Sequence, residues 1–301
     1  MANSKEIKRK IKSIKNTAKI TKAMELISTV KMKKAQDEAN SKKDFILDLL
    51  NSLSKMWATL DDFPLFEKSK EWKTLWVVIT SNKWLCWWYN VNTFKSINNY
   101  IWRTNEELDF ITCWKRGAQF VVKSGYEIIS DFSEKFTDNV TFDFSRNISR
   151  LILEQYKSWK YSKIVVFYNY FVNTIKQIAV EREFIPFVKE DIENYLIKIL
   201  WEEEYKQKFS NSKKDPNYVF EPWIETILEE LIPLLIDMMF YDMLLEAKAS
   251  EHSSRMIAMK NAKDNANKFA WKLTLEYNKA RQAAITKEVS EIVSWVESMK
   301  E

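Results

Sequence analysis

The sequence predicts an α/β protein in which long N- and C-terminal helices pair as a left-handed antiparallel hairpin rod, with a central Rossmann-like α/β domain at its base. Three observations predict this fold. Apolar or small residues recur in heptads near both termini, residues 234–301 contain neither Pro nor Gly, and short strand-like apolar runs occupy the middle of the chain. A sustained heptad repeat indicates helices that supercoil around a partner in a left-handed sense.

The C-terminal repeat extends from about Leu231 to Val296 in alternating steps of four and three. Its seam consists of Leu231, Leu235, Met238, Leu245, Ala249, Met256, Met259, Ala266, Ala270, Leu273, Tyr277, Ala280 and Ala284. About 65 helical residues would extend about 100 Å, which is too long for a helix inside a compact domain of this size. We therefore expect this helix to pair with another long one.

The N-terminal repeat predicts that partner as a helix over residues 2–58. Its seam consists of Ile7, Ile11, Ile14, Ala18, Met32, Ala35, Ala39, Ile46, Leu49, Leu53 and Met56. Between Ala18 and Met32 the seam is small or polar (Thr21, Glu25 and Ser28), so thin packing is expected there. The alternative is a pair of separate amphipathic helices on a globular core, although globular helices rarely exceed about 25 residues.

The central residues change from helical to strand-like periodicity. Strands are predicted at 75–80, 109–113, 163–171, 174–187 and 218–222, helices at 93–102 and 143–158, a turn at 114–117, and irregular structure over 188–220. Strand–helix–strand order indicates a partly parallel, layered sheet. The expected division is a helix over 1–60, an α/β domain over 61–220 and a second helix over 221–301.

Composition excludes several classes of protein. No run approaches the ~18 apolar residues of a membrane span, and the N-terminus lacks the apolar core of a signal peptide. Cys86, Cys113 and His252 are too few for a zinc site or a disulfide framework, so neither a metal nor a cofactor is expected. Between Lys5 and Lys43, 13 Lys and Arg outnumber 4 Asp and Glu, which indicates an acidic neighbour.

Glycine is unusually rare and tryptophan unusually common. The chain has 2 Gly and 13 Trp, whereas average usage of about 7% would give about 20 Gly. Read with Gly in place of Trp, SNKWLCWWYN (81–90) becomes SNKGLCGGYN, which suits a turn from a strand into a helix. The UGA codon means Trp in some genetic codes and Gly in at least one bacterial lineage. We therefore predict native glycine at Trp84, Trp87, Trp88, Trp114, Trp159 and Trp295, and leave Trp72 and Trp76 open.

Five segments carry a family resemblance. These are KEIKRKIKSIKNTAKITKAMELISTVKMKKAQ, SNKWLCWWYN with Gly for Trp, YNYFVNTIKQ, ASEHSSRMIAMKNAKDNA and LEYNKARQAAITKEVSEIVS. In this order they resemble the opening helix, the glycine-rich loop, the internal strand pair and the C-terminal helix of the gamma subunits of F-type ATP synthases. The resemblance covers nearly the whole chain.

The resemblance implies a non-catalytic rotor that couples ion flow through a membrane ring to ATP synthesis or hydrolysis. The implied partners are three alpha and three beta subunits, an epsilon subunit and the membrane c-ring, at the cytoplasmic face of a bacterial plasma membrane. Neither nucleic-acid binding nor direct membrane insertion is implied. The implied contact and coupling residues are Lys22, Met24, Arg255, Arg281, Gln282, Thr286 and Glu288.

Two other functions remain as alternatives. A nucleotide-binding module with a coiled-coil stalk would use the loop at 81–90 as a phosphate cradle, but the loop lacks a GK[ST] pattern and any acidic residue. A nucleic-acid binder would use the basic N-terminal helix, but no aromatic residue is interleaved with its lysines before Phe45.

Overall fold

The computed structural model describes residues 2–56, 73–104, 106–134, 140–186 and 221–299. Contacts between Cα atoms divide the chain into two units. The first contains Met1–Val30 and Arg255–Glu301, and the second contains Lys31–Ser254. The helices α1 (Ala2–Ser41) and α8 (Ile224–Ser298) each contribute to both units.

The second unit is built on a five-stranded sheet in the order β3-β2-β1-β4-β5. Its strands are β1 (Lys73–Val78), β2 (Glu107–Thr112), β3 (Ile128–Asp131), β4 (Lys163–Phe171) and β5 (Gln177–Ile185). β1 pairs in parallel with β2 and β4, β2 pairs in parallel with β3, and β5 pairs antiparallel with β4. The predicted partly parallel sheet is confirmed.

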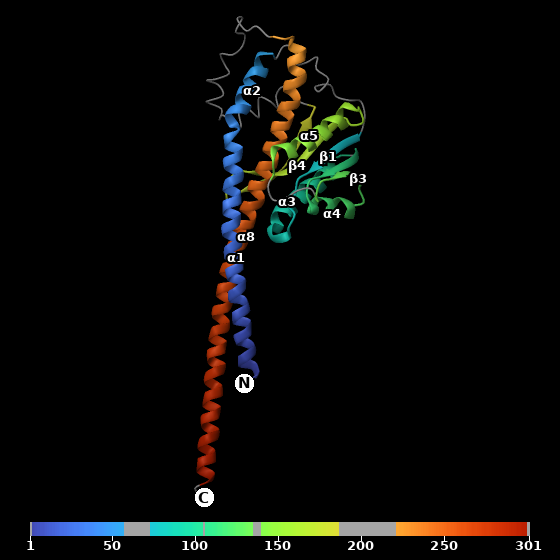
Figure 1. Cartoon of the computed structure of the whole chain (residues 1–301). Coiled ribbons are helices and arrows are strands. Elements are labelled where there is room, and N and C mark those ends of the chain that lie inside the picture. Colours follow the sequence, from blue (N-terminus) through green and yellow to red (C-terminus); the bar gives the residue numbers. More distant parts are fainter. Residues whose placement is uncertain (1, 57–72, 105, 135–139, 187–220, 300–301) are drawn as a thin grey trace. The chain divides into compact units, whose positions relative to one another are not determined.

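Helices cover both faces of this sheet (Figure 1). They are α2 (Lys43–Lys55), α3 (Trp87–Arg103), α4 (Lys115–Lys123), α5 (Phe142–Lys157) and the part of α8 that lies in this unit, with a short 3₁₀ helix at Trp84–Cys86. Alternate residues of β1 serve opposite faces: Val77 packs in the cluster with α5 and α8, whereas Trp76 packs in the cluster with α3 and α4. A strand that is buried on both faces is typically a continuous apolar run, and the sequence of β1 is of this kind.

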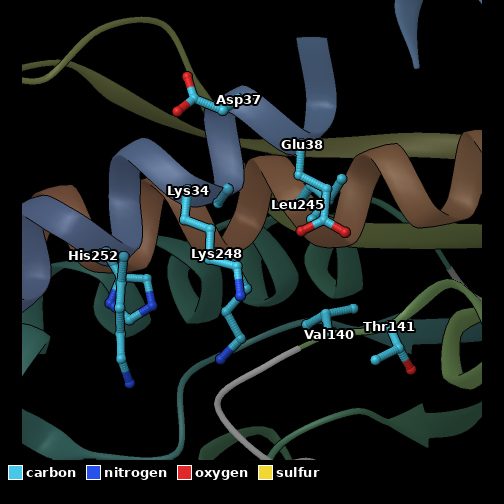
Figure 2. Close-up of a pocket in the computed structure, with 10 residues that line it drawn as sticks. Lys34, Asp37, Glu38, Val140, Thr141, Leu245, Lys248 and His252 are labelled. Atoms are coloured by element: carbon cyan, nitrogen blue, oxygen red, sulfur yellow. The ribbon is translucent and has the colours of Figure 1, made fainter. Parts of the chain in front are cut away.

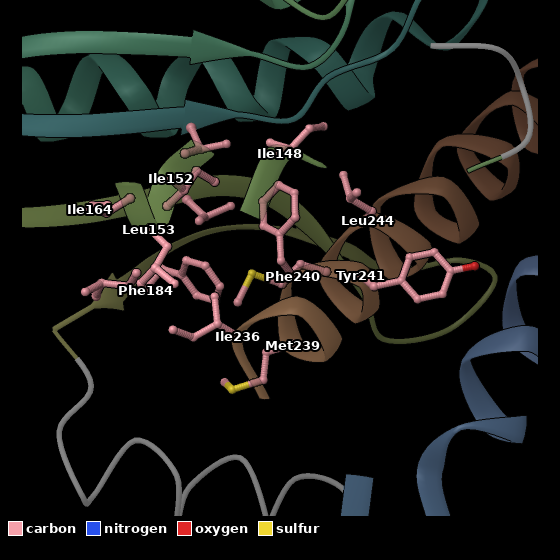
Figure 3. Packing of buried hydrophobic residues seen from close by; sticks show 14 of the residues in the cluster. Ile148, Ile152, Leu153, Ile164, Phe184, Ile236, Met239, Phe240, Tyr241 and Leu244 are labelled. Atoms are coloured by element: carbon pink, nitrogen blue, oxygen red, sulfur yellow. The ribbon is translucent and has the colours of Figure 1, made fainter. Parts of the chain in front are cut away.

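The larger core lies between the sheet, α5, α2 and α8 (Figure 3). From α5, Ile148 and Ile152 are fully buried, and from α8, Ile236, Phe240 and Leu244 are fully buried. Their spacings of three or four residues place each set on one helical face. Helix α8 therefore belongs to the core of the α/β unit over this stretch.

The smaller core centres on Trp76, whose ring lies 4.7 to 5.3 Å from the rings of Phe167, Tyr100 and Phe110. Trp76 is fully buried. Aromatic pairs at these separations stabilise by about 0.5–1.5 kcal/mol beyond the area that they bury. Of the two tryptophans left open by the sequence, Trp76 therefore suits its position as tryptophan, and Trp72 lies outside the described residues.

Three sequence predictions about local structure need correction, and one strand was missed. The helix predicted over 2–58 is two helices, because Lys42 adopts a turn with φ −98° and ψ −8° between α1 and α2. The predicted turn at 114–117 is wrong, since Lys115 begins α4. The helix predicted from residue 93 begins at Trp87, and strand β3 was not predicted.

Helix α8 also begins earlier than its heptad repeat and continues through Pro233. Proline removes a backbone donor and normally breaks a helix interior. Here the flanking residues Leu228, Ile232, Leu235 and Ile236 are all buried, and this packing holds the helix together across the proline. The strand predicted at 218–222 falls mostly outside the described residues.

Candidate functional site

The loop at 81–90 lies where the sheet turns into α3, the position of a phosphate-binding turn in nucleotide-binding folds. Its interior is occupied by a side chain of the protein. The Asn90 amide oxygen accepts from the Ser81 backbone N–H at 3.1 Å, and the Asn90 amide nitrogen donates to the Ser81 hydroxyl at 2.8 Å. The backbone donor that would face a phosphate is therefore already satisfied, which disfavours the nucleotide-binding alternative.

The first turn of α4 packs against the start of this loop. The Gly117 backbone N–H donates to the Thr80 hydroxyl at 2.8 Å, and the Arg116 backbone N–H donates to the Ser81 carbonyl at 3.4 Å. A Cβ at Gly117 would lie 3.1 Å from the Thr80 hydroxyl oxygen, so glycine permits this close approach. The segments that follow β1 and β2 are thus held together by hydrogen bonds.

The suspected glycine positions fall into different environments. Trp87, Trp88, Trp159 and Trp295 expose 53, 63, 51 and 73% of their surface, as expected for indoles that the fold does not need. Trp114 differs, because it is fully buried and the Lys248 ammonium lies 4.3 Å from its ring centroid. Trp84 lies in the 3₁₀ helix, and its side chain is outside the description.

Backbone geometry separates the same positions further. Among the described residues, Trp159 alone combines a side chain with a positive φ, at 56°. It directly follows Ser158, the C-cap of α5, and its N–H donates to the Tyr156 carbonyl at 3.0 Å. That is the left-handed position after a helix, which glycine favours. By contrast, α3 already begins at Trp87, whose φ of −53° is a helical value that any residue adopts, so backbone geometry does not single out glycine there.

In the described ranges, the cysteines and the single histidine belong to no group of three or more side chains that could hold a metal ion. Cys86 and Cys113 are both buried and neither forms a disulfide, and burial raises the pKa of the Cys113 thiol far above its usual value. A thiol held protonated is a poor nucleophile. His252 is also buried, on α8.

A cavity of about 450 Å³ lies between α1, α8 and the start of α5. Figure 2 shows Lys34 on α1 and Lys248 on α8 among the residues that line it. The remaining lining residues are Lys31, Ala35, Asp37, Glu38, Val140, Thr141, Leu245 and His252.

The charges around this cavity are largely balanced. The Lys248 ammonium is paired with Glu251 at 2.9 Å, and the Glu38 carboxylate accepts from the Tyr241 hydroxyl at 2.5 Å. The lining therefore lacks the surplus of one charge that an ionic ligand would need.

The residues implied as contacts lie mainly on the surfaces of α1 and α8. Lys22 is exposed and Met24 is half-buried on α1, whereas Arg255 on α8 is buried at 8% exposure. Arg281, Gln282, Thr286 and Glu288 are all exposed, and so are the apolar Ile285, Val289 and Ile292 between them. The distal end of α8 is thus exposed on its polar and its apolar sides alike.

Sequence reasoning missed one pair on these helices. The Lys263 ammonium lies 2.7 Å from a carboxylate oxygen of Glu25, and both side chains are about 20% exposed. Glu25 was noted as a polar position of the N-terminal seam, and Lys263 falls between Met259 and Ala266 on the other seam. An acidic residue on one seam and a basic residue on the other were the signal that could have predicted this ion pair.

Comparisons with known proteins agree with this architecture. A family model described as ATP synthase matches residues 3–299. The ATP synthase gamma chain of Cytophaga hutchinsonii is 34% identical over 308 residues and covers 99% of each chain. The ATP synthase gamma chain of Halothermothrix orenii is 34% identical over 303 residues and covers each chain completely.

Solved structures share the fold. The Euglena gracilis mitochondrial ATP synthase, rotor, gives a TM-score of 0.63 at 14% identity and covers 94% of this chain and 99% of that one. A chain of the Tetrahymena thermophila mitochondrial ATP synthase, central stalk and c-ring, gives a TM-score of 0.55 at 21% identity and covers 81% and 99%. From the full-length family match and the relatives above 30% identity, the chain belongs to the ATP synthase gamma chain family.

Proposed function

We propose that this chain is the gamma subunit of an F-type ATP synthase and acts as the central-stalk rotor. The observation that carries the proposal is similarity to ATP synthase gamma chains over 99–100% of both sequences. A shared domain alone would leave the rest of the function open, whereas a match from end to end includes the helices and the α/β unit together. The rotor couples ion flow through a membrane ring to ATP synthesis or hydrolysis on other subunits.

The terminal helices suit a part that transmits torque. Helix α8 extends for 75 residues and α1 for 40. We propose that they form an antiparallel left-handed coiled coil, with the helices assigned to 1–60 and 221–301 and the α/β domain to 61–220. The less exposed residues of α8 beyond Arg255 support this pairing, because Met259, Ala266, Ala270, Leu273 and Tyr277 follow the heptad seam.

The proposed partners are three alpha and three beta subunits around the helices, an epsilon subunit and the membrane c-ring. Lys22, Met24, Arg255, Arg281, Gln282, Thr286 and Glu288 are the proposed contact and coupling residues. Exposed ion pairs contribute about 0–1 kcal/mol each, so a basic helix can meet successive acidic surfaces without being trapped at one of them.

The protein is proposed to lie at the cytoplasmic face of a bacterial plasma membrane and to act without catalytic residues of its own. Among the described residues, no helix is both long enough and apolar enough to cross a bilayer. Attachment to the membrane would then depend on the c-ring.

Reconstitution tests the proposal. Alpha, beta and epsilon subunits from the same genome are combined with c-ring-containing membranes, with and without this chain. We expect ATP-driven ion pumping only when the chain is present, and rotation of a bead attached to the α/β unit. Pumping of equal rate without the chain would contradict the rotor function. Saturable nucleotide binding to the isolated chain would instead favour the nucleotide-binding alternative.

A further inference from the structure

In the first unit, α1 and α8 meet mainly through small side chains. On α1 its buried residues are Ala18, Thr21 and Ser28, and on α8 they include Met259 and Ala270. Small side chains make shallow knobs, which fit one turn of the partner helix almost as well as the next. Within this unit, packing alone therefore defines the axial register of the two helix segments weakly.

A directional contact lies in the middle of this interface. Lys263 donates to the Glu25 carboxylate at 2.7 Å, although the two residues are 238 positions apart in the sequence. Each side chain is about four-fifths buried. The hydrogen bond to Glu25 raises the pKa of Lys263 above its usual value.

The pair fixes which residues face one another. In an antiparallel arrangement the numbers of facing residues have a constant sum, so Ala18 and Ala270 face each other as Glu25 and Lys263 do, since 25 + 263 = 18 + 270. Sliding by one heptad in one direction would place Lys263 against Ala18. Sliding in the other direction would place Glu25 against Ala270. Either slip leaves a partly buried charge facing an alanine, which is unfavourable.

We propose that Glu25 and Lys263 are positioning residues that lock the axial register of the two terminal helices, so that the rotor turns as one rigid body. The register lock stands on the geometry of this unit, whereas its role in coupling rests on the proposed rotor function. A polar pair on a seam of small residues is a known means of selecting one register over its neighbours.

Cysteine cross-linking of the isolated full-length chain tests the register directly. Ala18→Cys with Ala270→Cys reports the native register, and Ile11→Cys with Ala270→Cys reports a slip of seven residues. The native Cys86 and Cys113 are buried and give little background. These pairs are combined with Glu25→Gln, with Lys263→Gln, and with the charge swap Glu25→Lys plus Lys263→Glu. Lys260→Gln, an exposed lysine of the same helix, is the matched control.

We expect each single variant to increase the slipped cross-link relative to the native one about two- to fivefold, the factor that one ion pair contributes to an equilibrium. The charge swap and Lys260→Gln should both give the ratio of the unaltered chain. An unchanged ratio in both single variants, or a charge swap that fails to restore it, would overturn the register lock.

The same variants in the reconstituted complex test the coupling role. Ions pumped per ATP hydrolysed should fall in the single variants and recover in the charge swap. If the register slips but this ratio does not change, the coupling role is wrong while the register lock stands. If the unaltered chain supports no pumping at all, the proposed function fails instead, independently of the cross-linking result.

Discussion

The Ser253 hydroxyl on α8 donates to the Thr174 carbonyl oxygen in the β4–β5 turn at 2.6 Å. The Gln177 side-chain amide donates in turn to the Ser253 oxygen at 3.2 Å. A helical serine usually bonds back to its own helix, whereas Ser253 is fully buried and bonds across to the sheet. This contact attaches the edge hairpin of the sheet to α8.

Ser253→Ala should lower the free energy of unfolding of the isolated chain by about 1 kcal/mol, because a partly buried carbonyl loses its donor. Amide hydrogen exchange at residues 173–177 should also become faster. Ser254→Ala is the matched control, since its hydroxyl takes no part in this contact. Equal urea midpoints for Ser253→Ala and the control would contradict a stabilising role.

A buried charge lies on another face of α8. The Asp237 carboxylate accepts from the Ser149 hydroxyl and lies 3.3 Å from the Arg146 guanidinium, with its side chain only 5% exposed. Burial raises the pKa of Asp237, although Ser149, Arg146 and Arg150 partly oppose this effect. A carboxyl with a raised pKa in the folded state stabilises the fold below its unfolded value of about 3.9. That stability is lost as the pH rises through the folded pKa.

We therefore compare the free energy of unfolding of Asp237→Asn with that of the unaltered chain. The difference should favour the variant more at pH 7 than at pH 4. The amide oxygen can still accept from Ser149, so we expect the cost at pH 4 to stay near or below about 1 kcal/mol. Urea unfolding at both pH values measures the difference. Glu154→Gln, an exposed carboxylate on α5, is the charge-matched control. A larger loss of stability at pH 7 than at pH 4 would show that attraction to the arginines outweighs the burial.

Sequence periodicity predicted the long helices and most of the sheet because each signal spans many residues. The continuous apolar run of β4, the alternation of β5 and the heptads of α8 are of this kind. Short elements gave no such signal. Strand β3 has four residues, and α4 begins within a sequence, WKRG, that is typical of a turn. The break at Lys42 has no Gly or Pro, and the helix through Pro233 depends on tertiary packing that a local pattern does not contain.

The candidate site was predictable mainly through family resemblance. Lys22, Met24 and the polar residues at the end of α8 carry no chemical signature of their own, since single polar residues on long helices are usually solvated. The Ser81–Asn90 hydrogen bonds could not be predicted, because they depend on how α3 folds back onto the loop. Glu25 and Lys263 could be suspected only after both seams were aligned antiparallel.

Met24→Lys should reduce coupling while leaving ATP hydrolysis largely intact. Met24 is half-buried on the basic face of α1, and an added cation there would bind one position of a beta subunit too strongly. The measurement is ATP-driven ion pumping and ATP hydrolysis in the same membranes, with Met24→Leu as the control of similar size. A proportional fall in both activities would show that Met24 lies elsewhere than at this contact.

The end of α8 gives a prediction about assembly. Gln282 and Thr286 are exposed one helical turn apart, and the Thr286 hydroxyl bonds back to the Gln282 carbonyl at 3.0 Å. Replacing both with Ala should weaken assembly with the alpha–beta ring, because two polar contacts are lost together. Truncation after Ser294 should be mild, since a terminal helical turn contributes little. A fully assembled, fully active double variant would refute the contact.

The last prediction is that Trp159 is glycine in the native protein. Its φ of 56° lies in the left-handed region, directly after the C-cap of α5. A side chain there costs about 1–2 kcal/mol, and glycine avoids this cost. Trp159→Gly should therefore raise the free energy of unfolding by about 1 kcal/mol. Trp159→Ala keeps a Cβ and should not raise it. Equal effects of Gly and Ala would show that the backbone does not require glycine.

The codons decide the same question for the other positions. UGA at 84, 87, 88, 114, 159 and 295 in a genome that decodes UGA as glycine would confirm all six, and the intact mass of the native protein would fall by one indole-bearing side chain for each. UGG at 159 would leave a strained tryptophan in the native fold. Trp114 is the sharpest case, because its buried ring fills space beside Lys248. Glycine at 114 would remove that ring, so either the core closes around the gap or tryptophan is genuine there.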